Sequence, residues 1–177
     1  DRLTSKQDIY GNVSRYSYDK NGNQTALGYG WANDYAVAYH YDAKNRLAGV
    51  THGFGSTSLA YHRDDRIKTK THDNGVTTEY TYDGYGNLST LSHKQGSTVM
   101  HQFGYDYDDN QNRTQETEFN GIDTIDYVVT EHQYDLAGNR THTINGKQQT
   151  TEWEYDELNR IKTLTYPEGD SYTYLYD

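Results

Sequence analysis

A Tyr-Asp pair recurs along the whole chain about every 22 residues, and this recurrence constrains the fold more than any other feature. A degenerate copy, Arg63-Asp64, fills the longest interval. A sustained period of this length is typical of a repeat array, in which each unit packs on its neighbours. The clear copies are Tyr18-Asp19, Tyr41-Asp42, Tyr82-Asp83, Tyr105-Asp106, Tyr134-Asp135, Tyr155-Asp156 and Tyr176-Asp177.

Each copy predicts a strand that ends in a tight turn. An aromatic residue stands two positions before the pair, and period two places both rings on one face of a strand. The aromatic residues are Tyr16, Tyr39, Tyr61, Tyr80, Phe103, Trp153 and Tyr174, and only His132 departs from the pattern. Asp favours the first position of a type I turn, because its carboxylate can accept backbone N–H groups. Three residues later we expect left-handed backbone, which Gly and Asn tolerate best, at Gly22, Asn45, Gly86, Gly138 and Asn159.

The turn sets the register of a hairpin with a three-residue loop and a bulge. It places Tyr41 opposite Leu47, Asp42 opposite Arg46, and Tyr155 opposite Ile161. A lone hairpin is marginal in water, so we expect the hairpins to pair edge to edge. The predicted fold is all-β, with tandem hairpins in one continuous curved or spiralling antiparallel sheet. Two hairpins could instead form a four-stranded propeller blade, an alternative that the uniform register disfavours.

Composition supports a thin sheet rather than a thick core. Only 32% of the residues are hydrophobic, yet the chain has 20 tyrosines, whose rings bury one face and keep the hydroxyl wet. The net charge of −10 argues against nucleic acid as a partner, because phosphate binding needs a basic surface. The absence of cysteine excludes disulfides. No apolar run reaches the roughly 18 residues that a membrane-spanning helix needs.

The repeated motif resembles the YD repeat, also called the RHS repeat, of bacterial polymorphic toxins, insecticidal toxin complexes and animal teneurins. The resemblance covers residues 1–177 as a single array of about eight repeats. It implies that this segment is an arc of a hollow shell, built from a longer array. It also implies a secreted or cell-surface location, with neighbouring repeats and a toxic cargo domain of the same parent chain as partners. The matching residues are structural, and the resemblance supplies no catalytic residue.

No constellation of residues predicts catalysis, a metal or a cofactor. Carboxylate pairs such as Asp64-Asp65 are common on so acidic a chain, and the eight histidines show no metal-ligand spacing. We therefore expect a structural module and not an enzyme. A carbohydrate-binding or adhesive array is the alternative, because aromatic faces stack on sugar rings. Its candidate residues are Trp31 and Trp153. A glycosidase would need two convergent carboxylates in a cleft.

Overall fold

The computed structural model describes residues 1–30, 35–121 and 127–177, and these residues form strands and turns with no helix. No helix that could cross a membrane is therefore present in the described part of the chain. The strands are β1 (Ser5–Gln7), β2 (Val13–Tyr18), β3 (Gln24–Tyr29), β4 (Tyr35–Tyr41), β5 (Leu47–His52), β6 (Gly55–Tyr61), β7 (Ile67–His72), β8 (Val76–Tyr82), β9 (Leu88–Gln95), β10 (Thr98–Tyr107), β11 (Arg113–Phe119), β12 (Tyr127–Tyr134), β13 (Arg140–Ile144), β14 (Thr150–Tyr155), β15 (Ile161–Thr165) and β16 (Ser171–Thr173).

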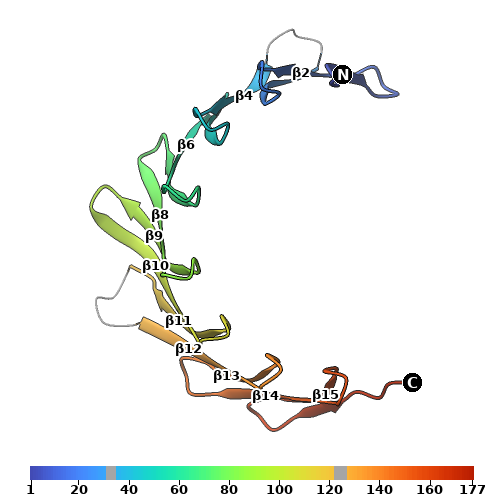
Figure 1. Cartoon of the computed structure of the whole chain (residues 1–177), viewed down its shortest axis with the longest axis vertical. Helices are drawn as coiled ribbons and strands as arrows, with labels where there is room; N and C mark the ends of the chain where they lie inside the picture. The colour runs from blue at the N-terminus through green and yellow to red at the C-terminus, as the bar shows by residue number, and fades with distance from the viewer. Residues whose placement is uncertain (31–34, 122–126) are drawn as a thin grey trace. The chain divides into compact units, whose positions relative to one another are not determined.

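Strand order follows the chain from β1 to β16 in a single sheet. Strands that follow one another in the sequence are hydrogen-bonded to each other, and Figure 1 shows the ribbon in this order. This meander confirms the predicted all-β class and tandem hairpins. It excludes the propeller alternative, because propeller blades are separate four-stranded sheets.

Two compact units make up the chain, Asp1–Thr78 and Glu79–Asp177. Within each unit the connections alternate between the two ends of the strands, because neighbouring strands are antiparallel. The turns of the motif follow β2, β4, β6, β8, β10, β12 and β14, so within a unit they share one end, which we call the motif end. The remaining connections lie at the opposite end.

The two strands that each of these motif turns connects pair in the predicted register. Tyr41 pairs with Leu47, and a bulge separates this pair from the rest of the ladder between β4 and β5. Tyr155 pairs with Ile161 in the same way. The register places the tyrosines and the aliphatic residues on one face, which we call the motif face.

A hydrophobic core is absent from the described residues, since no hydrophobic side chain in them is buried. The motif tyrosines are half-buried instead, and the buried polar side chains are Thr78, Ser92 and His132. A single layer of strands cannot enclose a side chain from both sides. Stability must therefore come from contacts along the ribbon, between one hairpin and the next.

Two copies of the motif lie elsewhere than the Tyr-Asp spacing predicts. The turn after β10 begins at Asp108 and not at Asp106, because Asp106 is inside the strand and pairs with Gln115. The motif tyrosine of this copy is therefore Tyr107. In the degenerate copy the motif tyrosine is Tyr61, which pairs with Ile67, so the assignment of Arg63-Asp64 to the Tyr-Asp positions was wrong.

Candidate functional site

Each motif turn is closed by its aspartate. In the turn after β4, Asp42 and Arg46 face each other, and the N–H of Asn45 donates to the Asp42 carbonyl at 3.0 Å. One carboxylate oxygen of Asp42 accepts the N–H groups of Lys44 and Arg46 at 2.8 and 3.0 Å. The other accepts the Arg46 Nε–H at 2.7 Å. The aspartate therefore fixes the turn as predicted, by accepting backbone donors that would otherwise need water.

The same geometry recurs in the other copies. Left-handed φ angles are found at every Gly and Asn where we expected them: Gly22, Asn45, Gly86, Gly138 and Asn159. Where Asn replaces Arg at the fourth position after the aspartate, its side-chain amide donates to the carboxylate. This hydrogen bond is the main cause that lowers the pKa of Asp19, Asp83, Asp108 and Asp135 below 3.8. The pKa of Asp156 is lowered chiefly by the backbone N–H of Arg160.

The motif tyrosine joins each repeat to the one before it. Its hydroxyl donates to the carbonyl at the start of the preceding return strand, over distances of 2.6 to 3.0 Å. We call this contact the tyrosine bond, and each such hydrogen bond contributes about 0.5–1.5 kcal/mol. The pairs are Tyr18 with Leu3, Tyr41 with Gln24, Tyr61 with Leu47, Tyr107 with Leu88, Tyr134 with Arg113, Tyr155 with Arg140, and Tyr176 with Ile161.

A second contact links neighbouring turns at the motif end. The residue four positions after the turn aspartate donates to the side chain of the left-handed residue in the next turn. We call this contact the turn bridge. It is formed by Asn23 with Asn45 at 2.9 Å, Arg46 with Asp65 at 2.5 Å, and Asn139 with Asn159 at 2.8 Å. Asn87 bonds to Gln111 in the same way.

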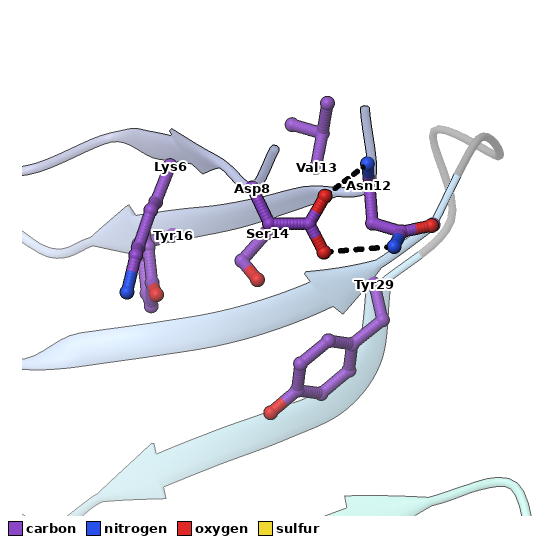
Figure 2. Close-up of a pocket in the computed structure, with 8 residues that line it drawn as sticks. Lys6, Asp8, Asn12, Val13, Ser14, Tyr16 and Tyr29 are labelled. Carbon is purple, nitrogen blue, oxygen red and sulfur yellow. Dashed lines mark hydrogen bonds between the residues drawn. The ribbon is translucent and has the colours of Figure 1, made fainter. Parts of the chain in front are cut away.

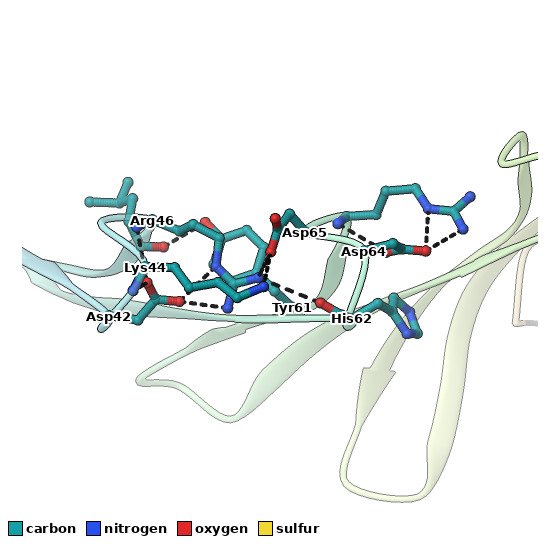
Figure 3. Close-up of polar contacts among 9 residues, drawn as sticks. Asp42, Lys44, Arg46, Tyr61, His62, Asp64 and Asp65 are labelled. Carbon is teal, nitrogen blue, oxygen red and sulfur yellow. Dashed lines mark hydrogen bonds and ion pairs between the residues drawn. The ribbon is translucent and has the colours of Figure 1, made fainter.

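Arg46 contacts several groups of the next repeat at one joint, shown in Figure 3. Its guanidinium is paired with both Asp42 and Asp65, and it lies 4.3 Å from the centre of the Tyr61 ring. Lys44 adds a second contact to Asp65 at 2.8 Å. A planar cation with several donors suits this position, because it can bind two carboxylates and stack on a ring at once.

The joint also explains how the degenerate copy keeps its turn. His62 occupies the aspartate position, and its backbone still pairs with Arg66 and Asp65. The missing carboxylate is replaced by Asp64, which accepts the backbone N–H of Arg66 at 3.2 Å and also its side chain. The Arg66 hydrogen bond lowers the pKa of Asp64 to about 2.

Sequence reasoning missed turns of the same design at the opposite end of the strands. Asp8 closes the connection between β1 and β2, where it accepts the N–H groups of Tyr10 and Asn12, and Asn145 does the same between β13 and β14. The pattern Asp-x-x-Gly-Asn at residues 8–12 was the available signal. Asp8 also borders a pocket of about 540 Å³ beside Lys6, seen in Figure 2, but the turn occupies its carboxylate.

In the described part of the chain, the candidate carboxylates lie at exposed positions and the Trp153 ring lies beside an arginine. A second pocket, of about 500 Å³, is lined by Glu152 and Glu168. Both side chains are exposed and lack the desolvated setting of a general acid. Among the described residues no three His, Asp or Glu side chains could hold a metal ion. Trp153 carries the Arg140 guanidinium 4.7 Å above its ring. Trp31 lies outside the described residues.

Comparison with known proteins agrees with this geometry. The family model of the RHS Repeat matches residues 61–98 and 134–171. The chain is 29% identical to the tRNA nuclease WapA of Bacillus subtilis and 28% identical to the tRNA3(Ser)-specific nuclease WapA of Bacillus spizizenii. Each alignment includes 97% of the chain, which spans only 10% of the length of these relatives.

Solved structures share the fold. The Photorhabdus luminescens Tc holotoxin pore matches with a TM-score of 0.68 and 15% identity, over 93% of this chain and 11% of that one. The crystal structure of TcdB2-TccC3-Cdc42 also matches with a TM-score of 0.68 and 15% identity, over 92% of this chain and 12% of that one. The chain therefore carries matches to the RHS Repeat, also called the YD repeat, at residues 61–98 and 134–171, and it shares the fold of these solved structures.

Proposed function

We propose that this chain is a non-enzymatic wall segment of a shell that encloses a toxic cargo domain of the same parent protein. The observation that carries the proposal is the tyrosine bond, which ties each hairpin to the preceding one within each unit. A repeated lateral contact of this kind suits a continuous wall, because every added repeat is held in the same way.

The relatives support the same role. The WapA proteins are named as nucleases, and this chain corresponds to a tenth of their length. A wall segment and a separate toxic domain would account for both facts. The structurally similar chains come from toxin complexes. A toxin shell of this kind would act in a secreted or surface-exposed protein.

A protease-protection assay on the intact parent protein tests the proposal. We expect the residues that follow the array to resist a soluble protease while the shell is folded. The triple substitution Tyr41→Phe, Tyr61→Phe and Tyr107→Phe removes three tyrosine bonds and should expose those residues to cleavage. The control Tyr85→Phe changes a tyrosine on a turn that is 81% exposed, and it should leave protection intact.

Two results would overturn the proposal. Equal cleavage of the following residues in the native and the urea-unfolded parent protein would show that nothing encloses them. Electron microscopy that showed an open rod without a lumen would exclude containment. Saturable binding of a sugar to the array would instead favour the carbohydrate-binding alternative.

A further inference from the structure

His132 occupies the position of the strand aromatic, two residues before the motif tyrosine Tyr134. It is the histidine copy of a position that is aromatic in most repeats. It lies on the motif face, and it pairs across the sheet with Thr143. With 8% of its surface exposed, it is the only buried titratable side chain in the described part of the chain. A ring that can gain a proton therefore occupies a position where most other copies place a neutral aromatic ring.

The surroundings of His132 favour its neutral form. Its Nδ1 lies 3.0 Å from the Thr143 hydroxyl. Burial, followed by the positive charges of Arg140 on β13 and Arg113 on β11, lowers the pKa of His132 below 6.5. Glu116 on β11 acts in the opposite direction but is already paired with Arg113 at 3.1 Å. A proton on His132 would thus add a buried positive charge between two arginines.

The joint around His132 also lacks the turn bridge, which is one of the two contacts found at other joints. The left-handed residue of the turn after β12 is Gly138, which has no side chain to accept a turn bridge from Asn112. The tyrosine bond from Tyr134 to the Arg113 carbonyl, at 2.9 Å, is still present. This repeat is therefore held to its predecessor by fewer side-chain contacts than the repeat that follows it, where Asn139 bridges to Asn159.

We propose that the joint formed by β11, β12 and β13 is an acid-sensitive opening point of the array, with His132 as its switch. Above about pH 6.5 both the folded and the open joint hold a neutral histidine. As the pH falls below that value, the open joint takes up the proton first. The equilibrium then shifts toward opening. The inference concerns the sheet itself and does not depend on what the parent protein encloses.

Hydrogen exchange at pH 7.5 and pH 5.0, corrected for the intrinsic pH dependence of amide exchange, tests the switch. In the full chain we expect the peptides of β12 and β13 to lose protection at pH 5.0, by up to about thirtyfold, which is the limit for a histidine that stays neutral in the folded joint. The peptides of β14 and β15 in the same unit should lose less. His132→Tyr restores the ring of the other copies, and His132→Gln keeps a neutral polar group beside Thr143. Both should remove the selective loss.

The matched control is His142→Gln, because His142 lies on β13 but pairs through the opposite face with Gln133. This variant should keep the selective loss of protection. The proposal is overturned if His132→Tyr and His132→Gln open at pH 5.0 as the unmodified chain does. It is also overturned if a proton NMR titration of the folded chain shows that His132 gains its proton at about pH 6.5 or above. That titration decides the question even if His132→Tyr fails to fold.

Discussion

Two tyrosines on strand β10 allow the contribution of the tyrosine bond to be distinguished from that of the aromatic ring. Tyr107 donates to the Leu88 carbonyl at 3.0 Å, whereas the Tyr105 hydroxyl has no hydrogen-bond partner among the described residues. Both rings are half-buried on the motif face, and Arg113 lies 5.2 Å from the centre of the Tyr105 ring. Replacing each by Phe removes one hydroxyl and leaves the ring in place.

We expect Tyr107→Phe to lower the free energy of local unfolding by about 1 kcal/mol, the net value of one hydrogen bond. Part of the loss comes from the Leu88 carbonyl, which must find water instead. Tyr105→Phe should change the free energy by less than about 0.5 kcal/mol, because the substitution removes no hydrogen bond. Partial burial of the Tyr105 side chain raises the pKa of its hydroxyl, chiefly by desolvation.

Hydrogen exchange measured on peptides from β9, β10 and β11 reports this local free energy. Tyr107→Phe should accelerate exchange there about fivefold, and Tyr105→Phe should leave it nearly unchanged. Equal effects of the two substitutions would refute the reasoning, since they would show that the tyrosine hydroxyl does not hold the joint. A larger effect from Tyr105→Phe would restore Tyr105-Asp106 as the motif pair.

Three further results are expected. Asp108→Ala should cost about 1 kcal/mol in urea unfolding, because two backbone donors lose their acceptor, while Asp106→Ala on the exposed strand should cost almost nothing. Gly138→Asn should be about 1 kcal/mol more stable than Gly138→Ala, because Asn tolerates the left-handed turn and can accept a bridge from Asn112; equal stabilities would contradict this. The lowered pKa values of Asp19, Asp83 and Asp135 stabilise the folded form above pH 3.8, so circular dichroism should show loss of the sheet as the pH falls below that value; a sheet that persists at pH 2 would contradict this assignment.

The motif alone predicted the fold because its information is local. The turn aspartate, the left-handed Gly or Asn, and the period-two aromatics each specify a conformation within a few residues. The pairs Tyr41 with Leu47 and Tyr155 with Ile161 follow from the turn length. Repetition then leaves pairing with the neighbouring hairpin as the way to satisfy the open strand edges.

The errors arose where local sequence is ambiguous. In "YDYDDN" one Tyr-Asp pair directly follows another, and the spacing favours the first pair. Only the second pair has a residue with a left-handed φ, Gln111, three positions after its aspartate. In the degenerate copy the turn carboxylate belongs to Asp64, two residues after the usual aspartate position, where it accepts the backbone N–H of Arg66. The Tyr-Asp spacing therefore indicated the wrong residues for this copy. The tyrosine bond joins residues 14 to 21 positions apart, and spacing alone does not reveal it.

A cryo-electron microscopy structure of the intact parent protein tests the central claim most directly. The account predicts that the hairpins continue edge to edge, with each motif tyrosine hydroxyl on the first carbonyl of the preceding return strand, and that this wall surrounds a lumen filled by other residues of the chain. Hairpins grouped into separate blades, or a wall with solvent on both faces, would contradict it.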